Sequence, residues 1–118
     1  MVAFRALLIA MCSCIAVYTA IVVAEHGLGL LPIFFGDMVK LGWPGQFNLD
    51  FTSLLTLSAL WVAWRHGFSG SGLALGGLAF FFGGFFLTAY LLIQSVRTRG
   101  DAAALLLGDA RAAALAGP

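Results

Sequence analysis

The feature that most constrains this chain is an apolar run at residues 6–24 that contains no charged side chain. Its nineteen residues would form a helix about 28 Å long, close to the thickness of the hydrocarbon core of a bilayer. Arg5 precedes the run, and Glu25 and His26 follow it, so polar groups stand at both ends. The run therefore predicts a helix that crosses a membrane.

Composition extends this expectation to the whole chain. Of the 118 residues, 62% are hydrophobic and only 9% are charged, whereas soluble domains average about 25% charged residues. A water-soluble fold would have to expose most of these apolar side chains, so we expect the lipid bilayer to be the solvent. The net charge of +1 provides no basic surface for nucleic acid, which we exclude as a partner.

A second crossing is predicted at residues 48–65. Asn48 suits an N-cap, and Asp50 would lie in the first turn, where the helix dipole favours an acid. Trp61 lies near the other end, at a depth where aromatic side chains concentrate, and Arg65 ends the apolar stretch.

A third crossing is predicted at residues 73–96, which carry no charge. Small residues recur along it at spacings of four, three and four, which brings them to one helix face and allows two backbones to approach closely. These predicted helix-packing residues are Gly72, Gly76, Ala79 and Gly83. We expect this face to associate with a second copy or with other membrane protein subunits.

Two segments lie outside these runs. Residues 28–42 are apolar but interrupted by Pro32 and charged at Asp37 and Lys40, which indicates an interfacial or re-entrant segment. The tail, residues 101–118, is rich in Ala and Leu and predicts a short interfacial helix or a frayed end.

The predicted fold is therefore an all-α membrane protein, a bundle of three transmembrane helices in one domain at residues 1–100. A four-helix alternative would let the interrupted segment cross as well, but Asp37 and Lys40 would then need partners inside the membrane. Residues 1–24 also permit a cleaved signal peptide, although the apolar core of a signal peptide is typically about 7–15 residues long and this run is longer.

Basic residues give a divided answer on orientation under the positive-inside rule. Arg5 before the first crossing favours a cytoplasmic N-terminus, which we expect. Arg97 and Arg99, placed beyond a third crossing, favour the opposite arrangement.

Polar residues gather between the first two predicted crossings, and ionisable groups at membrane depth are candidates for function. The candidate polar or ion-binding cluster comprises Glu25, His26, Asp37, Asn48 and Asp50. A proton- or ion-coupled transporter could use Glu25, His26 and Asp50, with His26 as the group that titrates near neutral pH. Alternatively, these residues end helices and stay in water at the interface.

A polar stripe follows the second predicted crossing, because Asn48, Thr52 and Thr56 recur every four residues. In lipid such hydroxyls bond to a neighbouring helix or to carbonyls of their own helix. The stripe therefore predicts local hydrogen bonding, with an ion path as the alternative.

Few residues in this sequence are candidates for catalysis or for binding a metal or cofactor. Cys12 and Cys14 are two residues apart and point to opposite sides of a helix, so they predict neither a metal site nor a local disulfide. Catalytic and nucleotide-binding motifs are absent, so we expect no enzymatic activity, no metal and no cofactor. A quinone or pigment could still sit among the aromatic residues of the third crossing, which are Phe80, Phe81, Phe82, Phe85 and Phe86.

Two stretches carry a resemblance to known proteins. Residues 42–51 read GWPGQFNLDF and residues 57–66 read LSALWVAWRH. In these stretches the chain resembles small multi-pass inner-membrane proteins of bacteria, a transmembrane family of unknown function, and the likeness extends over residues 27–99. The resemblance implies a bacterial cytoplasmic membrane and transfers no activity. We expect a structural or accessory subunit that acts through helix–helix association.

Overall fold

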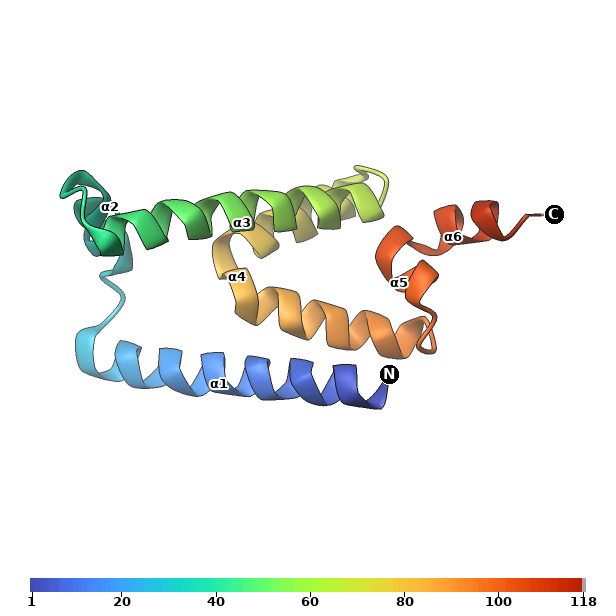
Figure 1. Cartoon of the computed structure of the whole chain (residues 1–118), viewed down its shortest axis with the longest axis horizontal. Coiled ribbons are helices and arrows are strands. Elements are labelled where there is room, and N and C mark those ends of the chain that lie inside the picture. Colours follow the sequence, from blue (N-terminus) through green and yellow to red (C-terminus); the bar gives the residue numbers. More distant parts are fainter. Residues whose placement is uncertain (118) are drawn as a thin grey trace.

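The computed structural model describes residues 1–117, and these residues contain helices and no strand. In chain order the helices are α1 (Val2–His26), α2 (Leu30–Val39), α3 (Trp43–Arg65), α4 (Gly70–Arg97), α5 (Ala102–Leu107) and α6 (Asp109–Ala116). The molecule is elongated, measuring 55 × 27 × 24 Å along its principal axes. Figure 1 shows α1 and α3 running along the long axis, with the part of α4 that follows its bend between them. The all-helical prediction is confirmed.

The helix α1 has 25 residues and contains the predicted apolar run. It ends at Gly27, whose φ of +74° is a conformation that glycine reaches without strain, and whose amide donates to the carbonyl of Val23. Only Leu8 is buried in this helix. Nearly all of its apolar surface is therefore exposed.

The start of α3 differs from the prediction. It begins at Trp43 and not at Asn48, so Asn48 is not an N-cap, and Asp50 does not lie in the first turn. Pro44 stands in the first turn of the helix, where a missing amide proton breaks no hydrogen bond. Pro44 and Gly45, a pair typical of turns, consequently begin a helix here, and the carbonyl of Asp37 in α2 packs directly on Gly45.

The interrupted segment forms the short helix α2. Pro32 is its third residue, a position where proline is tolerated because the amides of a first turn have no partner within the helix. Asn48 donates a hydrogen bond of 3.0 Å from Nδ2 to the carbonyl of Phe34, which holds α2 against α3.

The helix α4 is broken in the middle. At Gly83 the backbone has φ +56° and ψ −131°, which is not helical. The halves on either side, residues 70–82 and 84–97, are each about 20 Å long, shorter than the roughly 30 Å of a hydrocarbon core. The uninterrupted helix predicted at residues 73–96 is therefore wrong, and a third crossing is not confirmed.

The first half of α4 lies antiparallel to α3. A methyl group built at Gly76 would lie 3.0 Å from the carbonyl oxygen of Ala59, and one at Gly83 would lie 3.0 Å from the ring of Phe51. At the other end of this half, Gly72 packs beside His66. The chain thus travels from the end of α3 back to the level of Phe51 before it reaches the break.

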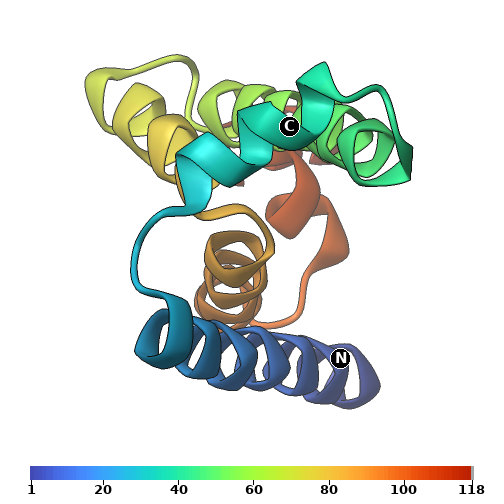
Figure 2. The same ribbon diagram turned by 90° about the vertical axis from the view of Figure 1, so that its left-hand side faces the viewer.

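The second half of α4 returns toward the end where α4 began (Figure 1), and Figure 2 shows this half between α1 and α3. Tyr90 packs edge-on against Trp61 of α3, with ring centroids 6.1 Å apart. On the opposite side, Gly84 lies beside Ile15, and Ser95 is hydrogen-bonded to Arg5 of α1. This half therefore separates α1 from α3, and both ends of α4 lie at one end of the molecule.

Two helices are long and apolar enough to cross a membrane by length and composition, namely α1 and α4. The helix α3 has comparable length, 23 residues, but carries more polar side chains. Because of the break at Gly83, α4 does not extend over its full length in one direction.

We predict that Gly83→Ala lowers the free energy of unfolding by about 1–3 kcal/mol, because the ψ and positive φ at this position are reached almost only by glycine. The added methyl group would also meet Phe51 and Leu55 at 3.0 and 3.1 Å. Gly77→Ala is the matched control, since Gly77 is helical and has nothing within 4 Å. It should be neutral or stabilising by about 0.5–1 kcal/mol. Unfolding in mild detergent measures both, and equal effects would contradict the prediction.

Candidate functional site

The most heavily bonded side chain of the molecule is Arg65, the last residue of α3. Its guanidinium is buried and donates to the carbonyl of Leu105 (2.7 Å), the carbonyl of Ala104 (3.1 Å) and the hydroxyl of Tyr90 (3.1 Å). The two carbonyls belong to the last turn of α5, which carries partial negative charge, and that of Ala104 also accepts from the amide of Gly108 at 2.9 Å. Arg65 therefore binds the end of α5 to the end of α3.

The hydroxyl of Tyr90 also meets His66, whose Nε2 lies 2.6 Å away. Burial lowers the pKa of His66 below its usual 6.5, and the positive charges of Arg65 and Arg97 lower it further. The imidazole is consequently neutral near pH 7. Because Tyr90 accepts from Arg65, its own proton is free to be donated to this neutral ring.

Further contacts hold the tail against α3. The indole Nε1 of Trp61 donates to the carbonyl of Leu106 at 3.0 Å. The guanidinium of Arg111 in α6 lies 4.1 Å from the centroid of the Trp64 ring and donates to the carbonyl of Trp64. The tail that was predicted as an interfacial helix or a frayed end is thus two short helices, and both are bonded to the end of α3.

Another arginine joins α1 to α4. Arg5 donates from Nε to Oγ of Ser95 at 3.1 Å and from its terminal nitrogen to the carbonyl of Ser95 at 2.9 Å. Ser95 itself is fully buried. This contact fixes the N-terminal part of α1 beside the second half of α4.

Charge is divided between the two ends of the molecule. We call one end the arginine end; it carries Arg5, Arg65, Arg97, Arg99 and Arg111. Asp101 and Asp109 also lie there, so its formal charge is +3. The other half carries Lys40 with Glu25, Asp37 and Asp50, which leaves −2. The basic residues favour two opposite orientations only when α4 is taken as an unbroken helix, because Arg97 would then lie at the other end of the molecule.

The side chains of the predicted polar cluster make separate contacts in the structure. His26 and Glu25 are neighbours with a nitrogen–oxygen distance of 3.9 Å, and both side chains are exposed. The side chain of Asn48 donates a hydrogen bond to the carbonyl of Phe34, Asp37 lies half-buried in α2, and Asp50 is exposed on α3. Within residues 1–117, no three His, Cys, Asp or Glu side chains come together to hold a metal ion.

The predicted helix-packing residues are all buried, and their partner is α3 of the same chain. Gly72, Gly76, Ala79 and Gly83 form a face of α4 that packs on residues such as Ala59 and Ala63. This surface is therefore occupied within the chain and is not open to a second subunit.

The hydroxyls of the predicted polar stripe bond to their own helix. Thr52 donates to the carbonyl of Asn48 at 2.8 Å, and Thr56 donates to the carbonyl of Thr52 at 2.9 Å. Ser58 is different, because its Oγ is buried without a hydrogen-bond partner in the described chain. Cys12 and Cys14 are both free.

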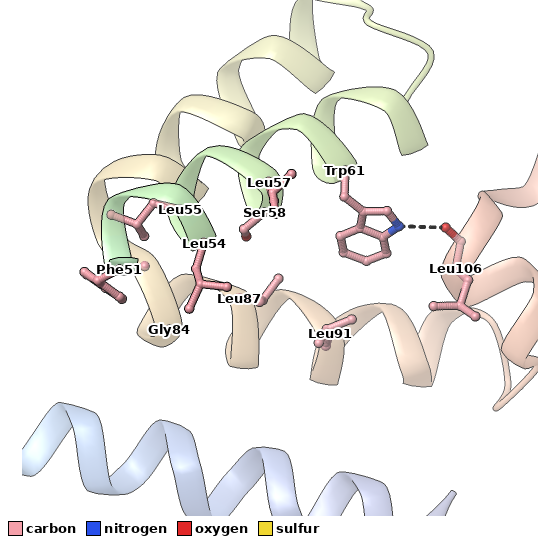
Figure 3. A pocket seen from close by; sticks show the side chains of 11 residues that line it. Phe51, Leu54, Leu55, Leu57, Ser58, Trp61, Gly84, Leu87, Leu91 and Leu106 are labelled. Atoms are coloured by element: carbon pink, nitrogen blue, oxygen red, sulfur yellow. Dashed lines mark hydrogen bonds between the residues drawn. The ribbon is translucent and has the colours of Figure 1, made fainter. Parts of the chain in front are cut away.

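An open apolar groove of about 610 Å³ lies between α3 and the second half of α4. Figure 3 shows Phe51 and Gly84 at one end and Trp61 with Leu106 at the other. Its lining residues are Phe51, Leu54, Leu55, Leu57, Ser58, Trp61, Gly83, Gly84, Leu87, Leu91 and Leu106. None of the five phenylalanines considered from sequence for a quinone or pigment belongs to this lining.

Sequence reasoning missed the group formed by Arg65, Tyr90 and the end of α5. From sequence Arg65 only marks the end of the apolar stretch, whereas the carbonyls it binds lie 39 and 40 residues further along the chain. One signal was present. Asp101 before an Ala/Leu run predicts a capped helix, and its carboxylate accepts from the amide of Ala103 at 3.0 Å.

Comparisons of the chain with protein-family models, with curated proteins and with solved structures give no match. The assignment of a role therefore depends on the geometry and on the sequence pattern.

We predict that Arg65→Ala releases α5, because two carbonyls and the Tyr90 hydroxyl lose a charged donor at once. Hydrogen bonds to charged groups contribute roughly 1.5–3 kcal/mol each, so the loss should be about 3 kcal/mol or more. Arg99→Ala is the control, since Arg99 is exposed and such changes usually stay within about 0.5 kcal/mol. Limited proteolysis of the tail and unfolding in detergent measure the two variants. A tail that stays protected in Arg65→Ala would contradict this account.

Proposed function

We propose that the chain is an integral membrane protein that serves as a small accessory subunit, and that α1 is the helix by which it associates with other membrane helices. In this proposal α1 and α3 cross the bilayer. The helix α4 enters from the arginine end, turns at Gly83 and returns to the same side. The length of its halves, about 20 Å each, supports this re-entrant path over a third crossing.

The charge distribution supports one orientation. Five of the six basic residues lie at the arginine end, and cytoplasmic segments carry the excess of Lys and Arg in membrane proteins. The arginine end is therefore cytoplasmic in our proposal, together with the N-terminus and the tail. The sequence resemblance favours the cytoplasmic membrane of a bacterium.

The observation that carries the accessory role is the incomplete packing of α1. Its contacts with α4 include Arg5 and Ile15, so they lie on one face and toward the arginine end. The opposite face presents Ser13, Cys14, Val17, Tyr18 and Ile21 along a shallow hollow.

Polar groups on that outer face need partners at membrane depth. Tyr18 is 74% exposed and lies roughly 12 Å along the axis from His26, inside the apolar part of the helix. Within residues 1–117, neither its hydroxyl nor that of Ser13 forms a hydrogen bond, whereas the threonines of α3 and α4 bond to their own carbonyls. An unpaired hydroxyl in hydrocarbon is costly, and a neighbouring helix removes that cost.

The re-entrant path makes a topological prediction. In a variant without native cysteines, Ser71→Cys and Arg99→Cys should both resist a membrane-impermeant maleimide added outside intact cells, while Lys40→Cys reacts. Three full crossings would instead place positions 71 and 99 on opposite sides. Labelling after lysis controls for reactivity, and opposite labelling of positions 71 and 99 would refute the re-entrant path.

The two cysteines of α1 allow a matched test of whether this helix associates with a partner. Cys14 lies on the outer face, whereas Cys12 is half-buried. A short thiol-directed cross-linker applied to native membranes should give a defined adduct with the wild type and with Cys12→Ser. The adduct should be lost in Cys14→Ser.

The mass of the adduct identifies the partner class. Twice the mass of the chain indicates a second copy, and any other discrete mass indicates a different subunit. If the second group of the cross-linker is photoactivatable and reacts with any neighbouring side chain, a Cys14 that is labelled but forms no protein adduct faces lipid, and the proposed role of α1 would then be wrong.

A further inference from the structure

We propose that Arg97 and Arg99, at the arginine end of α4, bind the phosphate of an anionic phospholipid, and that Ile93 and Val96 contact the upper part of its acyl chains. This inference rests on the membrane placement proposed above and is independent of the role of α1. It begins from two guanidinium groups without partners and from the apolar surface beside them.

Arg97 and Arg99 are the arginines of this end that the chain itself leaves without partners. They lie where α4 finishes, next to the start of α1 (Figure 1). Both side chains are exposed, and within residues 1–117 neither forms a hydrogen bond or an ion pair. The other three arginines of the arginine end all bond to groups of the chain. These two guanidinium groups are therefore available to an external acceptor.

The end of α4 does not require either charge as a cap. Backbone amides of residues 98–100 donate to the carbonyls of residues 94–96 at 2.9 to 3.1 Å. The hydroxyl of Thr98 adds a bond of 2.8 Å to the carbonyl of Gln94. The carbonyls that a helix end commonly leaves unpaired are thus satisfied without Arg97 or Arg99.

Positive charge is concentrated at this end without matching acids. The formal charge of the arginine end is +3, and Asp101 already accepts from an amide of α5. Burial, then Arg65 and then Arg97 hold the pKa of His66 below its usual value, so two guanidinium charges lie near one imidazole. Like charges placed close together repel, and a bound anion offsets that repulsion. The arrangement therefore favours an anionic ligand.

The apolar surface beside Arg97 identifies the kind of anion. Ile93 precedes Val96 by three residues and Arg97 by four, so it neighbours both on the helix surface. Ile93 is 56% exposed and Val96 is 60% exposed. A soluble anion would leave both side chains uncovered, whereas a phospholipid carries hydrocarbon next to its phosphate.

Depth in the bilayer agrees with this order of groups. Ile93 lies about 6 Å deeper than Arg97 along the axis of α4. In the proposed placement Ile93 reaches the hydrocarbon, while the long side chain of Arg97 extends to the level of the headgroups. Arginine suits a phosphate because its planar guanidinium can donate two parallel hydrogen bonds. The cytoplasmic leaflet, where this end is placed, also carries the anionic lipids.

The test determines which phospholipid stays bound. The intact protein is reconstituted into bilayers of equal parts phosphatidylglycerol and phosphatidylcholine with identical acyl chains, and native mass spectrometry weighs the lipids that it retains. We expect one phosphatidylglycerol adduct to predominate. Arg97→Gln should lower the preference for phosphatidylglycerol by about fivefold, and the double variant with Arg99→Gln should remove it.

Two further variants separate the contributions. Lys40→Gln is the matched control, since it removes the same charge from an exposed side chain at the other end, where the net charge of −2 repels anionic lipid. It should leave the phosphatidylglycerol adduct unchanged. Ile93→Asn keeps both arginines and should weaken the adduct, because the contact with the acyl chain is lost.

The outcomes distinguish this site from the membrane placement. Equal retention of the two lipids by the wild type, or an adduct that Arg97→Gln and Lys40→Gln change to the same extent, overturns the site and leaves the placement intact. An adduct that excess glycerol phosphate displaces overturns the choice of a lipid as the ligand. A protein that floats with vesicles of neither lipid in a density gradient overturns the membrane placement itself.

Discussion

At Gly83 the backbone takes a conformation that is reached almost only by glycine, and the direction of the chain reverses there. The second half of α4 then occupies the space between α1 and α3 on the arginine-end side. Three separate features follow from this reversal. Tyr90 reaches Arg65, Ser95 reaches Arg5, and the splayed second half leaves an apolar groove along α3.

The central cluster of buried hydrophobic residues is small, comprising Val62, Ala79 and Tyr90 with neighbours such as Phe86. In water such a core would be insufficient, because burial of apolar area is the main driving force for folding. In lipid the requirement is different. Backbone groups must be paired internally, and helices hold together by close packing and hydrogen bonds. The approach of Gly76 to Ala59 and the hydrogen bonds of Arg65 satisfy those requirements with few buried side chains.

Much of the helical content could be predicted from apolar runs, because α1 and the region of α3 contain uncharged stretches of helical length. The reversal at Gly83 could not. Gly83 also belongs to a small-residue spacing that fits an unbroken helix, and only the packing against Phe51 distinguishes the two. The start of α3 was missed because Pro44 suits both a turn and a first helical turn. Arg65 could not be assigned because its partners are distant in sequence. Nothing in the sequence of α5 indicates that this helix packs against the end of α3.

The attachment of α5 to Arg65 also sets an order for assembly. Synthesis proceeds from the N-terminus, so α3 and both halves of α4 are complete before residues 102–107 leave the ribosome. Until then the guanidinium has Tyr90 but lacks the two carbonyls that complete its shell. A charged group with incomplete pairing stays near water. The contacts of Arg65 are therefore complete only after α5 has been synthesised, so the end of α3 and the segment that follows α4 reach their final packing together.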